Sequence, residues 1–529
     1  MNRQTHTLNE YLELMQEQSI VSDFDLMDSA DQHVHKVTFN SKEVTFGTMF
    51  ICKGVHFKEE YLKEAIAQGA ICYVSEKRYD IADIPCIIVN DMRTAMAMLA
   101  DTFYNQAWSR INMIGLTGTK GKSTTAYFLK AILDDYSKAA GEPETAVLSS
   151  IDTYDGKQRF ESHLTTPEAV VLHGHIDNAV KSGIRYMTME VSSQALKYKR
   201  TQGIVYEVGS FLNLGEDHIS PIEHPTFEDY AESKLILFDQ CRTCIVNADS
   251  DYAEKVIERA KSSAVTKRII TFGTKDVSEC AGSDAEAETD SNGNANKCGD
   301  LTPDIVGYDI RPDRKGITFR AKGEGFDDEF RIGLTGIFNV SNALCAIAIA
   351  YSQNIPTEYI KSGLKRARVS GRMEVFSDET GDLTVIVDYA HNVMSMQALF
   401  DSTKKEYPDS HITIVFGCPG TKAIRRRKEL GEIAGRYADM CYLTEEDPGE
   451  EDVHSISEEI AVHVAEAGGK YVIIDDREEA IKKAIDDAKN QKTVILVTAK
   501  GRETRQKRGL EYIDVESDVD IVKRVLKEL

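Results

Sequence analysis

The stretch Gly115-Leu-Thr-Gly-Thr-Lys-Gly-Lys-Ser-Thr-Thr125 decides how the rest of the chain is interpreted. The apolar residues 111–116 indicate a buried strand, and 124–133 has apolar residues at helical spacing. A strand, a glycine turn and a helix that opens with Lys-Ser is typical of a phosphate-binding loop, because backbone N–H groups, the helix N-terminus and Lys122 all attract anions. The Ser123 hydroxyl can bind Mg²⁺. The stretch therefore predicts nucleotide binding on an α/β fold.

The loop is shorter than a standard P-loop. Leu116 stands where the standard spacing has a glycine, so the match is to the form Gly118-Thr-Lys-Gly-Lys-Ser123. The flanking strand and helix still favour phosphate binding over an ordinary polar turn.

Length and composition limit the class of protein. With 529 residues the chain is too long for one core, and we expect three domains. The sequence shows neither an apolar run of about 20 residues nor a signal peptide. Its cysteines are scattered singly, with the exception of Cys241-Arg-Thr-Cys244, which we interpret as structural. The net charge of −23 argues against nucleic-acid binding. We therefore expect a cytoplasmic, monomeric protein without membrane or nucleic-acid partners.

Alternating apolar runs and helical patterns predict three α/β units. Residues 1–110 form a small unit, 111–369 a central unit with a mainly parallel sheet, and 370–529 a Rossmann-like unit. The polar, acidic segment 277–302 has no aromatic residue and is expected to be a flexible insertion.

Three polar residues in the central unit are candidates for chemistry, each with an ordinary alternative. Glu190 ends an apolar strand, where it could bind Mg²⁺ or simply face solvent. His218 follows another apolar strand and is either a metal ligand or a loop histidine. Lys234 lies in the amphipathic helical pattern 227–238, where a solvated surface charge is the usual interpretation.

The order of these motifs resembles the Mur ligase family over essentially the whole chain. The resemblance rests on eight blocks in family order: Gly118-Thr-Lys-Gly-Lys-Ser123, Leu164-Thr-Thr-Pro-Glu168, Met189-Glu-Val-Ser-Ser193, Asn213 with Asp217-His218, Ser233-Lys-Leu-Ile-Leu-Phe238, Gly336-Ile-Phe-Asn-Val-Ser-Asn-Ala343, Gly371-Arg-Met-Glu374 and Asp388-Tyr-Ala-His-Asn392. Within the family, the chain looks most like the branch that adds the third residue of the cell-wall peptide. Leu164-Thr-Thr-Pro, Glu190-Val-Ser-Ser and Asn40-Ser-Lys-Glu-Val44 point to that branch.

The resemblance implies a role for each unit: the first binds the UDP-sugar, the second ATP and the third the incoming amino acid. The residues implied for ATP are Thr119, Lys120, Gly121, Lys122, Ser123, Thr124, Asn339, Arg372 and Asp388. Those implied for Mg²⁺ are Ser123, Glu190 and His218, and those implied for catalysis are Lys122, His218 and Lys234, the last as a carbamylated lysine (N6-carboxylysine). Those implied for the UDP-MurNAc-L-Ala-D-Glu substrate are Ser41, Thr165, Thr166, Ser192 and Arg200.

The implied reaction is an ATP-dependent amide ligation. The D-Glu γ-carboxylate of the substrate attacks the ATP γ-phosphate, and an amine of a free amino acid then attacks the resulting acyl phosphate. Because water would destroy this intermediate, we expect the third unit to close over the site.

The amino acid added is predicted from Glu446-Asp-Pro-Gly449, with Glu503 as a further implied contact. Diaminopimelate-adding members have Asp-Asn-Pro-Arg there, and the arginine holds the distal carboxylate. Gly449 replaces that arginine among several carboxylates, which favours an ammonium and hence L-lysine. Diaminopimelate, ornithine and a merely solvated acidic loop remain the alternatives.

Two nearby blocks depart from the family pattern. Gly417-Cys-Pro-Gly-Thr-Lys422 is followed by four basic residues, 425–428, which either bind a phosphate or carboxylate or form an exposed helix start. In Thr498-Ala-Lys-Gly-Arg-Glu503, Ala499 replaces a glycine that normally leaves backbone near the amino acid. A folylpolyglutamate synthase and a non-catalytic nucleotide-binding regulator are the competing functions.

Overall fold

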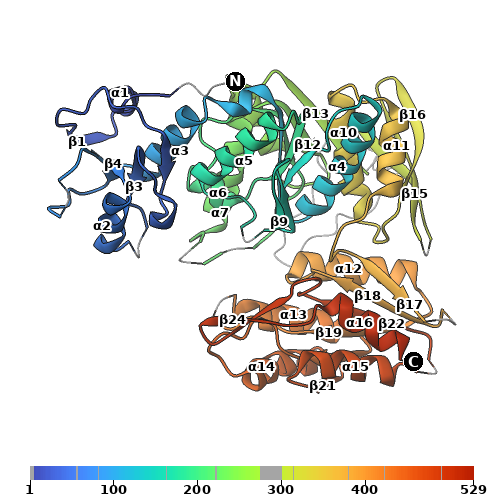
Figure 1. The fold of residues 1–529 in the computed structure, drawn as a ribbon. Helices are drawn as coiled ribbons and strands as arrows, with labels where there is room; N and C mark the ends of the chain where they lie inside the picture. The colour runs from blue at the N-terminus through green and yellow to red at the C-terminus, as the bar shows by residue number, and fades with distance from the viewer. Residues whose placement is uncertain are drawn as a thin grey trace.

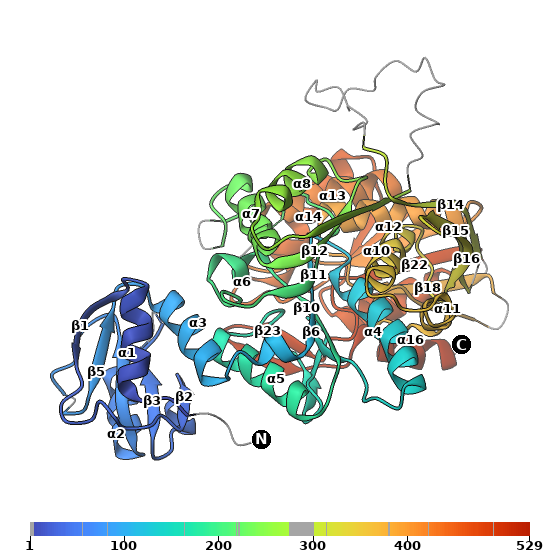
Figure 2. The ribbon, with the colours of Figure 1, turned by 90° about the horizontal axis from the view of Figure 1, so that it is seen from above.

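Three β-sheets organise the chain in the computed structural model, which describes residues 5–528 except 55–56, 82, 163, 218, 221–222, 275–300, 314, 379–380, 422 and 490. In Figure 1 the first sheet lies to the left of the second, and the third lies below the second. Seen from above in Figure 2, the first sheet still stands beside the second, and the third lies behind it.

The first sheet has the strand order β1-β5-β4-β3-β2, and among its strands only β1 is antiparallel to its neighbour. Its strands are β1 (Val21–Asp25), β2 (Lys36–Thr38), β3 (Thr48–Ile51), β4 (Ala70–Ser75) and β5 (Cys86–Val89). Its helices are α1 (Leu8–Glu17), α2 (Glu59–Ala67) and α3 (Met92–Phe103). The core beneath this sheet continues into Ala169 and Val170 of the second unit, so the two units share apolar contacts.

The second sheet has eleven strands in the order β16-β15-β14-β13-β12-β11-β6-β10-β7-β8-β9. Its parallel centre consists of β6 (Asn112–Thr117), β7 (Ala146–Leu148), β10 (Tyr186–Glu190), β11 (Tyr206–Phe211), β12 (Cys241–Asn247) and β13 (Arg268–Gly273). The antiparallel ends consist of β8 (Asp152–Tyr154) and β9 (Arg159–Glu161) on one side, and β14 (Ile305–Asp313), β15 (Gly316–Gly323) and β16 (Phe326–Ile332) on the other. The ends of β6, β10 and β11 meet at one edge, where parallel sheets bind ligands.

Helices cover both faces of the second sheet. One core contains α4 (Lys122–Ala139), α10 (Asn339–Ser352) and α11 (Thr357–Arg366), which Figure 2 shows side by side. Gly363 lets α11 approach α4 closely, because a Cβ there would lie 2.4 Å from the Ile132 Cα. The opposite core contains α5 (Ala169–Lys181), the 3-10 helix Ile236–Asp239 that follows α7 (Phe227–Leu235), and α8 (Ala253–Ser262); the short α6 (Ser193–Lys197) adds Leu196.

The third sheet has the order β17-β18-β22-β19-β20-β21 and is parallel except for β17. Its strands are β17 (Glu374–Ser377), β18 (Leu383–Asp388), β19 (His411–Phe416), β20 (Met440–Leu443), β21 (Tyr471–Ile473) and β22 (Thr493–Thr498). Its helices are α12 (Val393–Glu406), α13 (Arg425–Tyr437), α14 (Val453–Glu466), α15 (Arg477–Asp487) and α16 (Asp518–Lys527). The hairpin β23 (Arg505–Arg508) and β24 (Glu511–Asp514) stands apart from the sheet. Strand order reverses around β22, so a ligand crevice is expected beyond β18, β22 and β19.

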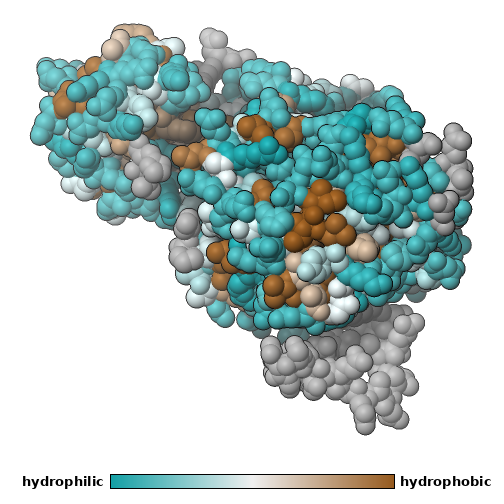
Figure 3. All heavy atoms as spheres, turned by 90° about the horizontal axis from the view of Figure 1, so that it is seen from below, coloured by the Kyte–Doolittle hydropathy of each residue, from teal (hydrophilic) through white to brown (hydrophobic). Residues whose placement is uncertain are grey.

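The surface of the third unit that points away from the second unit is partly apolar. Figure 3 is seen from this side and shows brown patches within a mostly hydrophilic surface. Val462 on α14 and Tyr471 and Val472 on the edge strand β21 are among the exposed apolar side chains of this unit. None of the described helices is long and apolar enough to cross a membrane.

The α/β class and the doubly wound third unit are confirmed, but the antiparallel ends of the second sheet were not expected. The segment 277–302 lies almost entirely outside the described residues, and the boundaries after 110 and 369 stay predictions. Cys241 and Cys244 are both buried, with 3.3 Å between their Sγ atoms and no disulfide, which agrees with the structural interpretation.

Candidate active site

The phosphate-binding loop connects β6 to α4 and depends on two glycines. Gly118 and Gly121 have positive φ values of 155° and 85°, and Gly121 is the residue before α4. A Cβ at Gly121 would lie 2.2 Å from the Asn342 Oδ1, so a side chain cannot be placed there. The backbone thus turns tightly into a helix N-terminus, which presents N–H groups to an anion.

Two lysines, the half-buried Lys122 and the buried Lys234, share a carbonyl oxygen of this loop. The Lys122 Nζ donates to the Gly118 oxygen at 2.8 Å, and the Lys234 Nζ donates to the same oxygen at 3.0 Å. Burial lowers the pKa of Lys122 and brings the pKa of Lys234 well below its ordinary value. Lys234 is 2% exposed, which excludes the surface-charge interpretation. A lowered pKa favours the neutral amine, which is the form that reacts with CO₂.

Hard oxygen ligands gather around Ser150, which sequence reasoning missed. The Ser150 N–H and hydroxyl lie 2.9 and 3.2 Å from the Glu190 Oε1, and the Ser123 and Ser150 hydroxyl oxygens are 3.1 Å apart. Hydroxyl and carboxylate oxygens fit Mg²⁺. His218 lies outside the described residues. Among the described residues, no group of three or more His, Cys, Asp or Glu side chains could hold a metal.

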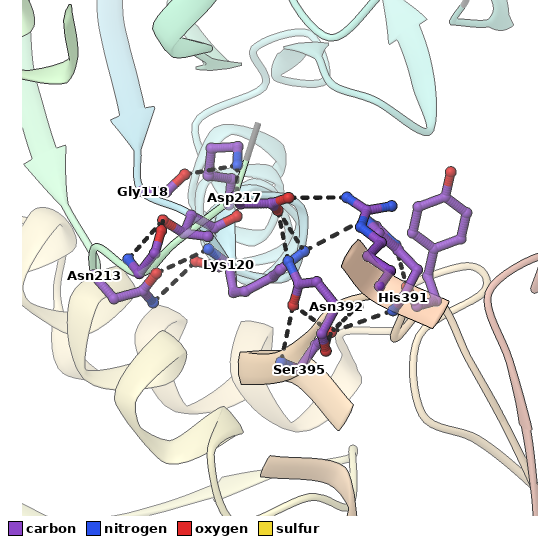
Figure 4. Close-up of polar contacts among 12 residues, drawn as sticks. Gly118, Lys120, Asn213, Asp217, His391, Asn392 and Ser395 are labelled. Atoms are coloured by element: carbon purple, nitrogen blue, oxygen red, sulfur yellow. Dashed lines mark hydrogen bonds and ion pairs between the residues drawn. The ribbon is translucent and has the colours of Figure 1, made fainter. Parts of the chain in front are cut away.

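Asp217 joins the second sheet to the third (Figure 4). Its carboxylate accepts from the Asn392 Nδ2 at 2.6 Å and the Arg426 Nη2 at 2.9 Å, and lies 3.4 Å from the Lys120 Nζ. The Lys120 Nζ is also 3.5 Å from the His391 Nε2. Burial lowers the pKa of Lys120 to about 8 and, together with the Lys120 and Arg426 charges, lowers that of His391 well below its usual value. A carboxylate beside the phosphate loop is thus the meeting point of two sheets.

The other residues implied for ATP line the same junction. The buried Asn339 opens α10 and donates to the Thr335 oxygen at 2.7 Å. Asp388 ends β18, accepts from the Met373 N–H at 2.9 Å, and has its pKa raised by burial. Arg372 stacks 4.2 Å from the Tyr389 ring centroid. In the second unit, the Thr119 hydroxyl lies 3.1 Å from the Tyr230 hydroxyl, and Thr124 is buried in the first turn of α4.

Four of the five residues implied for the UDP-MurNAc-dipeptide lie in the second unit. The Thr166 hydroxyl donates to the Glu190 oxygen at 2.8 Å and accepts from the Ser192 N–H at 3.1 Å. Arg200 donates to the Thr166 oxygen at 3.0 Å, while Thr165 is half-buried next to it. These contacts connect the implied substrate set directly to the Glu190 strand.

The fifth residue, Ser41, lies in the first unit and donates to the Glu64 carboxylate at 2.6 Å. The link between these two units was missed from the sequence. Lys53 follows β3 and Arg200 follows α6, and both lie 2.6 Å from oxygens of Glu168.

The loop after β20 carries the predicted amino-acid residues. Glu445 pairs with Arg508 of the β23–β24 hairpin at 2.6 Å, and Asp447 pairs with Lys500 at 2.9 Å. Within the part of the chain that the structure describes, Glu446 has neither a hydrogen bond nor an ion pair. Burial raises its pKa to about 8.

The hairpin fixes this loop at Gly449 and brings Glu503 near it. The Gly449 N–H donates to the Lys507 oxygen at 3.1 Å, and the Gly509 N–H donates to the Gly449 oxygen at 2.6 Å. Glu503 lies 2.7 Å from the Lys500 Nζ and accepts from the Tyr389 hydroxyl at 2.5 Å. Pro448 is buried in the same turn, and Lys500, which contacts both Asp447 and Glu503, connects the loop to Glu503.

Residues 425–428 were predicted either to bind a phosphate or carboxylate or to form an exposed helix start, and different members of the group fit each prediction. Arg426 binds Asp217, and Arg427 pairs with Glu451 and Glu459, both at 2.7 Å. The side chains of Arg425 and Lys428 are 73% and 64% exposed, as an exposed helix start predicts. Of the four, Arg426 therefore reaches the phosphate loop's side of the junction.

Comparisons with known proteins agree with this geometry. The family model described as the Mur ligase middle domain matches residues 116–350, and that of the Mur ligase glutamate ligase domain matches 371–501. A UDP-N-acetylmuramoyl-L-alanyl-D-glutamate–L-lysine ligase from Enterococcus faecalis is 37% identical over 90% of this chain and 88% of its own. One from Streptococcus agalactiae is 34% identical, over 93% and 92%.

Solved structures show the same fold. A UDP-N-acetylmuramoyl-L-alanyl-D-glutamate–2,6-diaminopimelate ligase has a TM-score of 0.65 at 22% identity, with 99% of each chain covered. A folylpolyglutamate synthase from Mycobacterium tuberculosis has a TM-score of 0.57 at 15% identity, covering 76% of this chain and 92% of its own. The chain belongs to the Mur ligase family and is an ATP-dependent, amide-bond-forming ligase.

Proposed function

We propose that this ligase joins L-lysine to the D-Glu γ-carboxylate of UDP-MurNAc-L-Ala-D-Glu, a step of peptidoglycan precursor synthesis. The observation that carries the choice of lysine is Glu446, a carboxyl group without an ion pair among the described residues, three positions before Gly449. One amine of lysine reacts and the other stays an ammonium, which pairs with a carboxylate at low dielectric. The relatives named as L-lysine ligases support the same choice.

The phosphate end of the site supports ATP as the co-substrate. Lys122, Lys234, Lys120 and Arg426 converge on the loop, while Asp217 and Glu190 are the carboxylates closest to it in the described contacts. The positive charge of Lys122, Lys120 and Arg426 is balanced when a polyphosphate binds. The implied residues Thr119, Gly121, Ser123, Thr124, Asn339, Arg372 and Asp388 complete the proposed ATP site.

Magnesium would be held by Ser123 and Glu190, with His218 as the further ligand that the resemblance implies. Bound there, Mg²⁺ would neutralise charge on the phosphates. We propose that Lys234 acts as its carbamate, because burial next to Gly118 favours the neutral amine that forms one.

The chain's own residues then have distinct tasks. Lys122 and the loop N–H groups hold the γ-phosphate in line with the γ-carboxylate of the dipeptide. The carboxylate oxygen bonds to phosphorus as the bond to the ADP oxygen breaks. The lysine amine next attacks the acyl carbon, phosphate leaves with its electron pair, and the amine proton passes to the departing phosphate. The Asp217 junction closes this site against water.

The dipeptide substrate would lie between the first and second units. Ser41, Thr165, Thr166, Ser192 and Arg200 are the proposed contacts, with the UDP end toward the first sheet. Strands β2–β4 are parallel, so the loops after them form one edge, where Lys53 approaches Glu168. We expect a cytoplasmic monomer with the three units as assigned, because ATP and the UDP-sugar are cytoplasmic metabolites.

Phosphate release tests the proposal. Purified protein should release phosphate from ATP only when UDP-MurNAc-L-Ala-D-Glu and an amino acid are both present, with lysine the best of a panel containing diaminopimelate and ornithine. Faster turnover with diaminopimelate would overturn the choice of lysine. Turnover of a folate with glutamate would indicate the folylpolyglutamate synthase alternative, and ATP binding without ligation would indicate a regulator.

A further inference from the structure

Two of the four basic residues at the start of α13 contact the second unit, and Arg426 is the less exposed of the two. Arg426 is 18% exposed and its Nη2 lies 2.9 Å from the Asp217 Oδ1, whereas Arg427 pairs with Glu451 and Glu459 of the third unit. Arg425 contacts Glu216 and Glu429 at the surface. Arg426 is therefore a third-unit cation placed at the phosphate loop.

The charges around Arg426 do not balance. The Asp217 carboxylate contacts Arg426, Lys120 and the Asn392 amide at once. Figure 4 shows Lys120 and Asn392 meeting at this carboxylate. The Arg426 charge also contributes to lowering the pKa of both Lys120 and His391, so it acts on groups of both sheets. Glu446 also feels the Arg426 charge, but burial raises its pKa to about 8, so Asp217 is the carboxylate that Arg426 and Lys120 share. Two cations that share one carboxylate can accept an additional anion.

We propose that Arg426 is a further catalytic residue, a cation that contacts the phosphoryl group as it moves from ATP to the substrate carboxylate. The proposal rests on the proposed ligase function. In this step the γ-carboxylate oxygen bonds to the γ-phosphorus, the bond from phosphorus to the β,γ-bridging oxygen breaks, and ADP leaves with the electron pair. The Arg426 guanidinium donates to the equatorial phosphoryl oxygens, which carry the developing charge.

Because Arg426 comes from the third unit, its contact with the phosphoryl group also links phosphoryl transfer to the position of that unit. Because α13 belongs to the amino-acid-binding unit, phosphoryl transfer is fastest when that unit lies against the loop. The acyl phosphate therefore forms where the incoming amine is already close, and its exposure to water is limited.

The test measures acyl phosphate formation in a single turnover, with hydroxylamine trapping and no amino acid added. The variants are Arg426→Gln, Arg426→Lys and, as a matched control one residue away, Arg425→Gln. We expect Arg426→Gln to slow the step about 100-fold, as loss of one transition-state donor does. Arg426→Lys should recover about tenfold of the lost rate, since lysine restores the positive charge but not the two parallel N–H donors of the guanidinium. Arg425→Gln should react at the wild-type rate.

A second control separates catalysis from a structural tie between the sheets. Asn392→Ser keeps the helix cap of α12 but is too short to reach Asp217. We expect its loss to be at least about tenfold smaller than that of Arg426→Gln, because it removes a contact between the two sheets but no donor to the phosphoryl group. Equal losses in Asn392→Ser and Arg426→Gln would overturn the proposal, as would a wild-type rate in Arg426→Gln.

The two proposals fail in different ways. If wild-type protein forms no acyl phosphate, the ligase function itself is wrong. If wild type is active and a folded Arg426→Gln variant, matched to it by circular dichroism and by UDP-substrate binding, is equally active, only the role of Arg426 is wrong.

Discussion

The phosphate loop and the amino-acid loop are built in opposite ways, although both follow strands of parallel sheets. The phosphate loop is one continuous turn, its positive φ values belong to Gly118 and Gly121, and its surplus charge is positive. The amino-acid loop is assembled from segments around 389, 446, 500 and 508, and its charged groups are mainly carboxylates. Its positive φ values include 61° at Gly449, but also 44° at Asp447 and 86° at Ala499, which are not glycines. Phosphate binding, which the whole family shares, thus depends on one continuous turn without backbone strain. The choice of amino acid depends on segments that are distant in the sequence.

The largest effect is expected from Lys234→Ala, which removes the buried amine that we propose forms a carbamate beside the phosphate loop. Turnover should fall at least about 100-fold with every amino acid, because the carbamate would no longer help to position the Mg²⁺ that neutralises phosphoryl charge. Bicarbonate should not restore it. Lys138→Ala, at an exposed position late in α4, is the control. The contrast between the two loops breaks if Lys234→Ala changes which amino acid is preferred.

The next largest effect is expected in the amino-acid loop, from Glu446→Gln. The KM for lysine should rise about 30-fold, corresponding to about 2 kcal/mol for a buried charge partner, while the KM for ATP stays the same. Steady-state kinetics with each substrate varied in turn would show this. The exposed neighbour Glu450 provides the control variant Glu450→Gln; an equal rise there would mean that the acidic loop acts only through its general charge.

Gly449→Arg should weaken the preference for lysine by about tenfold relative to diaminopimelate, because a guanidinium repels the ammonium and attracts a carboxylate. A Cβ at Gly449 meets nothing closer than the Gly509 oxygen at 3.9 Å, but φ is 61°, so the substitution costs about 1–2 kcal/mol of stability. Gly449→Ala measures that backbone cost separately. An unchanged ratio of kcat/KM values for the two amino acids would count against the position.

The sequence predicted much of the difference between the two loops, and there are physical reasons why it did not predict the rest. Gly118–Ser123 was identified because its strand, turn and helix are contiguous. The burial of Lys234 had a signal that was not used, since Phe227, Tyr230 and Ala231 precede it at helical spacing on one face. The alternation in β15 likewise indicated an antiparallel strand.

Contacts between units had no such signal. Arg426–Asp217 and Lys53–Glu168 join residues 209 and 115 positions apart. They depend on how whole sheets are placed against each other, which no local pattern records.

A smaller effect should follow from pH. The pKa of Glu446 is raised to about 8, so below that pH the carboxyl holds a proton that a bound ammonium must displace. The KM for lysine, relative to that of Glu446→Gln, should be about tenfold higher at pH 7 than at pH 8.5. The raised pKa also means that this group's contribution to stability falls as pH rises from its unfolded pKa toward 8. Parallel pH profiles for the two proteins would refute this assignment.

The smallest effect concerns the strain at Ala499. Ala499→Gly should raise the free energy of unfolding by about 0.5–1 kcal/mol, because relief of a positive φ exceeds the extra flexibility of glycine in the unfolded chain. Urea unfolding would measure it, and the amino-acid preference should not change. Loss of stability would show that Ala499 makes packing contacts that outweigh the strain.

The Glu168 junction has a consequence for substrate length. Lys53 and Arg200 approach the same carboxylate from two units, and Ala169 and Val170 extend the first unit's core into the second. A first unit fixed in this way makes the distance from the nucleotide end of the substrate to the phosphate loop a constant of the molecule. The protein then selects substrates by peptide length as well as by chemical identity. A peptide one residue shorter or longer can bind at both ends only with its carboxylate out of line with the γ-phosphate.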